Sequence, residues 1–119
     1  MRDQALVQWQ WDLYPKNHQD RRNLKVHIAT NPLFLLGTVG LLVAPVLGSA
    51  LFALGGAAGM FTAVAAQGRG HKLEKNPPEP FEGPLDVVAR IFVEQWVTFP
   101  RFVLSGGFAR AWREAAKAG

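Results

Sequence analysis

The chain has 119 residues, no cysteine, 49% hydrophobic residues and a net charge of +4, a length that suits one domain. The lack of cysteine excludes disulfide frameworks and thiolate metal sites. A basic balance is typical of proteins that bind nucleic acid or anionic lipid, and because the basic residues flank the longest apolar stretch, we expect a membrane lipid partner and no nucleic acid.

Residues 3–14 predict a short amphipathic helix, because Leu6, Trp9 and Leu13 recur on one stripe at helical spacing. Pro15 ends this helix, since the residue before a proline is disfavoured in helical geometry. The aromatic residues suit a helix that lies at a membrane interface. The alternative is that the same stripe packs in the core of a soluble bundle.

Residues 33–67 contain no Asp, Glu, Lys, Arg or His, and all charged residues of the chain lie outside this stretch. One helix of that length would be ~52 Å long, beyond a hydrocarbon core of ~30 Å. Pro45 and Gly48 supply a break, so we predict two antiparallel helices. Asp20 is a suitable N-cap for the first helix, which holds Pro32 as a kink or in the first turn of a new helix.

A polar, proline-rich connector precedes a second amphipathic pattern at 84–104, where Val88, Phe92 and Trp96 are four residues apart. Charged residues interrupt this pattern and would be costly at mid-bilayer. We therefore expect the segment to lie at the interface or to pack on the hairpin, and a third spanning helix is the alternative. The predicted fold is all-α: one membrane-embedded domain over residues 1–119, a helical hairpin at 33–67 with flanking amphipathic interfacial helices.

The three histidines of the chain, His18, His27 and His71, flank the hairpin on its charged side. A hairpin returns the chain to that side, so we expect the histidines to meet there. His18 and His27 would be ~13.5 Å apart on one continuous helix, so a shared site needs a bend between them. By the positive-inside rule this side is predicted to be cytoplasmic, in an integral protein of the bacterial inner membrane.

His71 and Glu74 are three residues apart and share a face if that segment is helical, as in carboxylate-bridged iron sites of helical bundles. Asn23 and His27 are four apart and would also share a face. Nitrogen ligands with a carboxylate and no thiolate favour iron, zinc or copper over calcium or magnesium. The alternative is three surface histidines near anionic headgroups.

Two blocks carry a resemblance to a known family. The first block is Leu13-Tyr14-x-x-x-His18-Gln19-x-x-x-Asn23-x-x-x-His27, followed by Pro32 and the hairpin, and the second is Gly70-His71-Lys72-Leu73-Glu74-Lys75-Asn76-x-Pro78. Residues 9–104 resemble the bacterial and fungal membrane family that includes the 2-hydroxy fatty-acid dioxygenase of α-oxidation. The resemblance depends on these two blocks, on their order and on the hairpin between them. The hairpin is shorter than in many relatives, and the tail after Ser105 has no counterpart.

The resemblance implies a non-haem iron(II) enzyme that uses dioxygen to remove one carbon from 2-hydroxy fatty acids. It implies that His18, His27, His71 and Glu74 are catalytic residues that ligate Fe(2+) or lie beside it, and that Asn23 orients a ligand. The substrate carboxylate needs a cation, and the candidates nearby in sequence are Arg21, Arg22, Lys25 and Lys72, most of which we expect to form a solvated collar.

A non-catalytic membrane subunit that packs in a larger membrane complex is the alternative function. The small size of the chain and its Gly/Ala-rich second apolar segment favour it. Gly55 and Gly59 have the four-residue spacing that allows close helix contact, within the hairpin or in a homo-oligomer. Stoichiometric iron in the purified protein distinguishes the enzyme from the subunit.

Overall fold

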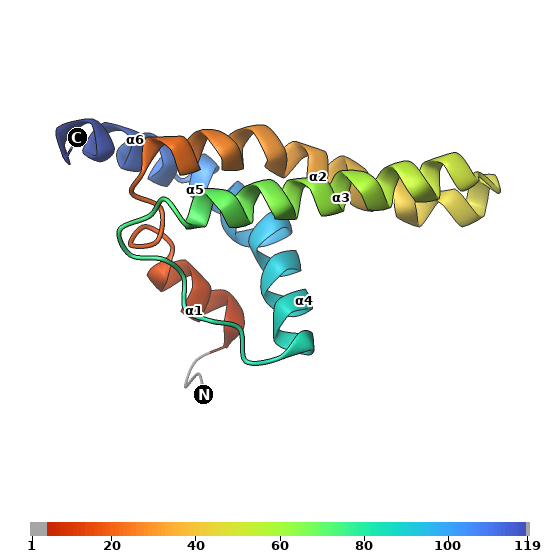
Figure 1. Ribbon diagram of the computed structural model, residues 1–119, viewed down its shortest axis with the longest axis horizontal. Helices are drawn as coiled ribbons and strands as arrows, with labels where there is room; N and C mark the ends of the chain where they lie inside the picture. The colour runs from red at the N-terminus through yellow and green to blue at the C-terminus, as the bar shows by residue number, and fades with distance from the viewer. Residues whose placement is uncertain (1–4, 119) are drawn as a thin grey trace.

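The computed structural model describes residues 5–118, and these residues form helices with no strand among them (Figure 1). The predicted all-α fold is confirmed. A long hairpin projects from a base in which the other helices gather. In chain order the elements are α1 (Leu6–Leu13), α2 (Arg21–Leu47), α3 (Ala50–His71), α4 (Pro84–Val93), the π-helical segment η1 (Glu94–Thr98), α5 (Phe99–Leu104) and α6 (Gly107–Ala118).

The hairpin consists of α2 and α3, and local chemistry sets its ends. Asp20 caps α2 as predicted, since its side chain accepts a hydrogen bond from the backbone N–H of Arg22. The chain runs as one helix through Pro32 and also through Pro45, so the break lies after the predicted proline. The helix ends at Leu47 and is capped by Gly48, whose φ of 59° lies in the left-handed region that favours glycine. Ser49 then caps α3 by accepting from the backbone N–H of Phe52.

Gly37 and Gly56 allow the two long helices to cross closely. A Cβ atom added to Gly37 would lie 2.6 Å from the backbone oxygen of Gly56, and one added to Gly56 would lie 2.5 Å from the backbone oxygen of Gly37. Of the predicted spacing pair, Gly59 faces Leu33, whereas Gly55 has open space around it. The hairpin contact therefore depends on Gly56 and leaves Gly55 on the outside.

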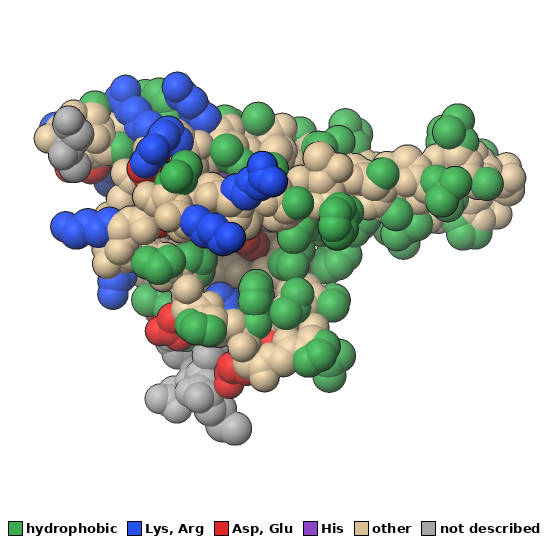
Figure 2. Space-filling model, viewed as in Figure 1, with side chains coloured by type: hydrophobic (Ala, Val, Ile, Leu, Met, Phe, Trp, Pro, Cys, Tyr) green, Lys and Arg blue, Asp and Glu red, His purple; other side chains and the backbone are tan. Residues whose placement is uncertain are grey.

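Both long helices are long and apolar enough to cross a membrane. Only 28% of the most apolar window of α2 and 17% of that of α3 are buried within the chain, whereas the core helix of a soluble protein is mostly buried. Figure 2 shows hydrophobic side chains along the projecting hairpin, while Lys and Arg side chains gather at the base. The most exposed large side chains of the hairpin are Leu36, Leu42, Val46, Leu51, Leu54 and Phe61.

The base of the molecule is held by aromatic packing and by contacts between α1 and the α4–η1 segment. Tyr14, Leu24, Phe99 and Phe102 form a buried cluster against which the apolar side of α6 packs. Gln10 on α1 donates to the backbone oxygen of Arg90 on α4. The predicted helix at 3–14 is confirmed from Leu6 onward, and residues 3 and 4 lie outside the described part.

Candidate metal centre

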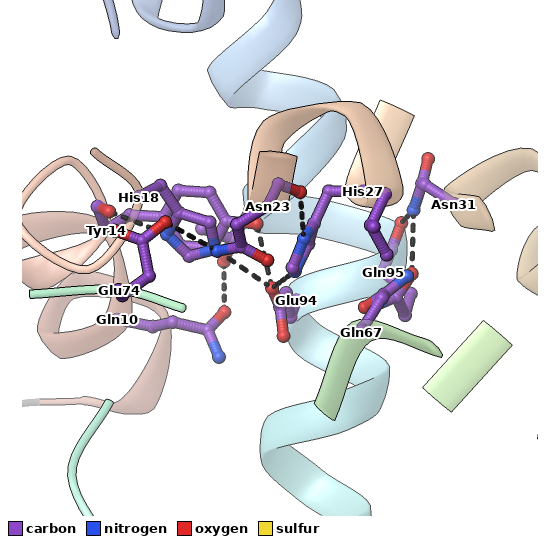
Figure 3. Close-up of polar contacts among 12 residues, drawn as sticks. Gln10, Tyr14, His18, Asn23, His27, Asn31, Gln67, Glu74, Glu94 and Gln95 are labelled. Carbon is purple, nitrogen blue, oxygen red and sulfur yellow. Dashed lines mark hydrogen bonds and ion pairs between the residues drawn. The ribbon is translucent and has the colours of Figure 1, made fainter. Parts of the chain in front are cut away.

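Four side chains from four parts of the chain converge at the base of the hairpin. Figure 3 labels three of them, His18, His27 and Glu94. His18 lies in the loop after α1, His27 on α2, His71 at the end of α3 and Glu94 at the start of η1. Each offers one ligand atom, and these atoms all lie within 4.8 Å of one another. The three imidazole centroids are 4.8 to 5.1 Å apart, so the structure brings the three predicted histidines together.

Backbone carbonyls orient two of the imidazoles. His18 Nδ1 lies 2.8 Å from the carbonyl oxygen of Tyr14, and His27 Nδ1 lies 3.0 Å from that of Asn23. A carbonyl oxygen only accepts, so each Nδ1 carries the proton and donates it, and each Nε2 carries a lone pair. This is how proteins hold a metal-ligating histidine. The non-helical turn after Pro15 supplies the predicted bend that allows His18 to reach His27.

The nitrogens that face the centre have no hydrogen-bond partner. Among the described residues, His18 Nε2, His27 Nε2 and His71 Nδ1 are buried and unsatisfied, a rare condition for polar atoms inside a protein. His27 Nε2 lies 3.2 Å and His18 Nε2 3.7 Å from Glu94 Oε2. Since lone pairs and a carboxylate face one another there, a cation between them would satisfy all four side chains.

Glu94 is the carboxylate of the centre. Burial by itself raises the pKa of this carboxyl, but whenever His18 and His27 carry a proton on Nε2, their hydrogen bonds and positive charge outweigh burial and hold the pKa well below its ordinary value. The Tyr14 hydroxyl donates to Glu94 Oε2 at 2.8 Å. Burial, followed by the negative charge of Glu94, raises the pKa of Tyr14 well above its ordinary value, so this hydroxyl stays a proton donor.

Glu74 occupies a different place from the one predicted. Because α3 ends at His71, Glu74 does not share a helical face with that histidine. Its carboxylate instead accepts hydrogen bonds from the backbone N–H groups of Gln19 and Asp20 and from the side-chain amide of Asn23. Glu74 therefore ties the loop that carries His18 to the start of α2 and lies outside the group of ligand atoms.

The backbone carbonyl of Asn23 lies against His27 Nδ1, whereas its side chain, for which the orienting role was predicted, donates to Glu74. Gly70 faces Asn23 so closely that an added Cβ atom would overlap the side-chain oxygen of Asn23. The glycine in the second sequence block thus allows α3 to approach α2 beside the centre. Glu94 is the candidate ligand that the sequence pattern missed, although an acid inside an amphipathic apolar helix is the kind of signal that marks such a residue.

An apolar pocket of about 440 Å³ opens against the centre. His18, His71 and Glu94 line it, whereas His27 does not, so a bound molecule would approach from the side of the first three. The walls are mainly apolar, and the proline-rich connector forms one side. The lining includes Leu13, Val64, Pro78, Phe81, Val87 and Ile91.

Only one of the four predicted carboxylate-binding cations lines this pocket, and it is Lys72. Arg21 donates to the backbone oxygen of Trp112 and lies over the indole ring, 4.2 Å from its centroid. Arg22 pairs with Asp20 at 2.9 Å. Lys25 also lies over the ring of Trp112, at 5.9 Å, so these three cations are engaged at the base surface.

No family model, no curated protein and no solved structure matches the chain. The metal interpretation therefore depends on the four side chains themselves. Three imidazole nitrogens and one carboxylate oxygen form a donor set that suits iron, zinc or copper. The site can hold a metal ion, and the donor set alone does not select among these metals.

Proposed function

We propose that this protein is a membrane-bound iron(II) dioxygenase that acts on 2-hydroxy fatty acids, with His18, His27, His71 and Glu94 as the metal ligands. The observation that supports a metal enzyme is the set of three unsatisfied imidazole nitrogens facing one carboxylate beside an apolar pocket. Iron(II) bound there would supply the activation of dioxygen. Open non-haem iron sites use the same histidine and carboxylate donors.

The pocket fits a substrate with an acidic head and an apolar tail. Its apolar walls would receive the acyl chain, and Lys72 would pair with the carboxylate. The reaction balances without an external reductant: the hydroxy acid and dioxygen give the acid one carbon shorter, carbon dioxide and water. All the electrons that dioxygen accepts come from the substrate.

The chain's own residues hold and shield the centre. The carbonyl groups of Tyr14 and Asn23 fix the two ring orientations, and the Tyr14 hydroxyl holds the Glu94 carboxylate. Phe99 and Phe102 lie behind His27 and His18, with ring centroids 5.8 and 6.3 Å away. These rings keep water from the side of the centre that the pocket does not reach.

The proposal includes a location in the bacterial inner membrane with the histidine end on the cytoplasmic side. Basic side chains gather at that end, as Figure 2 shows, and the hairpin tip carries no charge. That asymmetry is the sequence signal that orients membrane segments. A site at the cytoplasmic membrane surface would receive a lipid-soluble substrate from the bilayer.

The decisive experiment is anaerobic reconstitution of the purified protein with iron(II), followed by turnover of 2-hydroxy palmitate in air. We expect one iron per chain and loss of both iron and turnover in His27→Ala. Lys75→Ala is the matched control, because Lys75 is exposed and lies outside the pocket lining. Stoichiometric iron without turnover would show that 2-hydroxy fatty acids are not the substrates. Absence of bound metal would favour the non-catalytic membrane subunit.

A further inference from the structure

The segment formed by α4 and η1 carries an apolar face that is exposed along its length and meets the hairpin only in part, at Phe92 and Trp96, among the described residues. Leu85 is 87% exposed, Val88 56%, Trp96 42% and Phe92 37%. Their spacing of three and four residues places them on one side of the helix. The opposite side carries Arg90 and Glu94, which line the pocket. We infer that acyl chains of one leaflet cover this face, and that the hairpin enters the bilayer from that side without emerging on the other.

The apolar face of α4 points toward the hairpin tip. Gln95, which precedes Trp96 and lies about 100° away from it around the helix, is bonded to Asn31 of α2. Phe92 contacts Phe34, with ring centroids 5.2 Å apart, and the indole of Trp96 donates to Thr38 at 3.4 Å. Since Phe34 and Thr38 lie beyond Asn31 in the direction of the tip, the face of Phe92 and Trp96 looks the same way as the tip.

The face of α4 is continuous with the exposed apolar surface of the hairpin. In Figure 2 hydrophobic side chains cover the projecting hairpin and the side of the lower lobe that faces its tip, while Lys and Arg side chains lie at the other end. An amphipathic helix in this position would lie in the plane of the interface with its apolar side toward the acyl chains. One lipid surface would then cover both elements.

This placement fixes how deep the hairpin reaches. An interfacial helix buries its apolar side by about 5–10 Å, which puts Trp96 and its partner Thr38 at most about 10 Å below the surface of the hydrocarbon. From Thr38 to the end of α2 at Leu47 the helix rises by a further ~14 Å. The tip therefore reaches about 24 Å, which is less than the ~30 Å thickness of the hydrocarbon core.

The chemistry of the tip suits a position within hydrocarbon. Val46 is 83% and Leu47 59% exposed, and the turn carries no charge. Three of its backbone donors are bonded inside the turn: the N–H groups of Gly48 and Ser49 donate to carbonyls of the last turn of α2, and that of Phe52 donates to the Ser49 hydroxyl. Backbone groups that are bonded within the chain tolerate a medium without water.

Because the chain has no cysteine, single cysteines report these depths cleanly. Val46→Cys marks the tip, Val88→Cys marks the face of α4, and Lys75→Cys is the control at the basic end. All three positions are exposed, so the substitutions leave the packing intact. The variants would be reconstituted into vesicles of phosphatidylethanolamine and phosphatidylglycerol, with a membrane-impermeant maleimide supplied on both sides of the bilayer.

We expect Lys75→Cys to react, and both Val46→Cys and Val88→Cys to lose labelling in vesicles and to regain it in detergent. Nitroxide spin labels at positions 46 and 88 should collide more often with oxygen than with a water-soluble nickel complex. The ratio of the two collision rates should place position 46 deeper in the bilayer than position 88. Labelling at position 46 would show that the hairpin crosses, and labelling at 88 would show that α4 lies in water. A nitroxide at 88 that is shielded from both oxygen and nickel and dipolar-broadened would assign this face to a second copy. Each of these three results overturns the inference.

Discussion

Tyr14 and Glu94 are separated by 80 positions in the sequence and joined by a hydrogen bond of 2.8 Å from the tyrosine hydroxyl to the carboxylate. The oxygen that accepts this bond is the one that lies 3.2 Å from His27 Nε2. Tyr14 also stacks on His18, with ring centroids 3.8 Å apart, and its carbonyl oxygen orients that imidazole. One residue of the N-terminal segment therefore positions two of the four ligand side chains.

Tyr14→Phe tests this positioning role. The phenyl ring keeps its stacking on His18, while Glu94 loses its hydroxyl donor, so we expect metal affinity to fall by about 10–100-fold, as for other groups that orient ligands. The lost buried hydrogen bond should also destabilise the fold by about 1 kcal/mol. Competition with a chromophoric chelator measures the affinity. Unchanged affinity in a folded variant would show that Tyr14 is merely a core residue.

Substitution of the two carboxylates should affect different properties of the protein, metal binding for Glu94 and folding stability for Glu74. Glu94→Gln removes a ligand and should abolish stoichiometric metal binding. Glu74→Gln weakens the bonds to the His18 loop and should lower the free energy of unfolding by about 1.5–3 kcal/mol while metal still binds. Metal analysis and thermal melts on both variants distinguish these effects. If Glu74→Gln lost the metal and Glu94→Gln kept it, Glu74 would be the ligand, as expected from the sequence.

The sequence predicted much of this fold because its strongest signals are local. The uncharged stretch, Gly48 and the Asp20 cap are sufficient to define the hairpin, and a hairpin necessarily returns His71 to the side of His18 and His27. The sequence marks Glu94 as an acid in an apolar helix, but local signals do not show that Glu94 rather than Glu74 reaches the histidines. Which of the two acids does so depends on where α3 ends and on how η1 turns toward the base, and both are set by packing between distant segments.

Removal of metal should destabilise the protein, because the buried imidazole nitrogens and the Glu94 carboxylate would then face one another with no cation between them. At a free metal concentration 100 times the dissociation constant, binding contributes about 2.7 kcal/mol to stability. We therefore expect a chelator to lower the melting temperature and iron(II) or zinc(II) to restore it. His18→Ala should melt at one temperature in either condition. A chelator effect of equal size in His18→Ala would place the metal elsewhere.

Gly56 and Gly55 provide a matched pair for the crossing of the hairpin. A methyl group at Gly56 would meet backbone atoms of α2 at 2.5 and 2.8 Å, whereas at Gly55 it would meet open space. We expect Gly56→Ala to separate the helices and to destabilise the protein by about 1–3 kcal/mol. Gly55→Ala should leave stability unchanged or raise it slightly. Thermal melts in the same detergent compare the two, and equal melting temperatures would contradict the observed crossing.

Lys72 and Lys25 provide a matched pair for substrate binding. Lys72 lines the pocket, whereas Lys25 lies over Trp112 at the base surface. A charge-assisted bond between Lys72 and the substrate carboxylate would contribute about 1.5–3 kcal/mol, so Lys72→Met should raise KM by about 10–150-fold. Lys25→Met should change KM little, and neither variant should lose bound iron. Turnover of 2-hydroxy palmitate at a series of substrate concentrations measures the KM of both variants. An increase of KM in Lys25→Met rather than in Lys72→Met would show that the substrate carboxylate binds near Lys25 and not in the pocket.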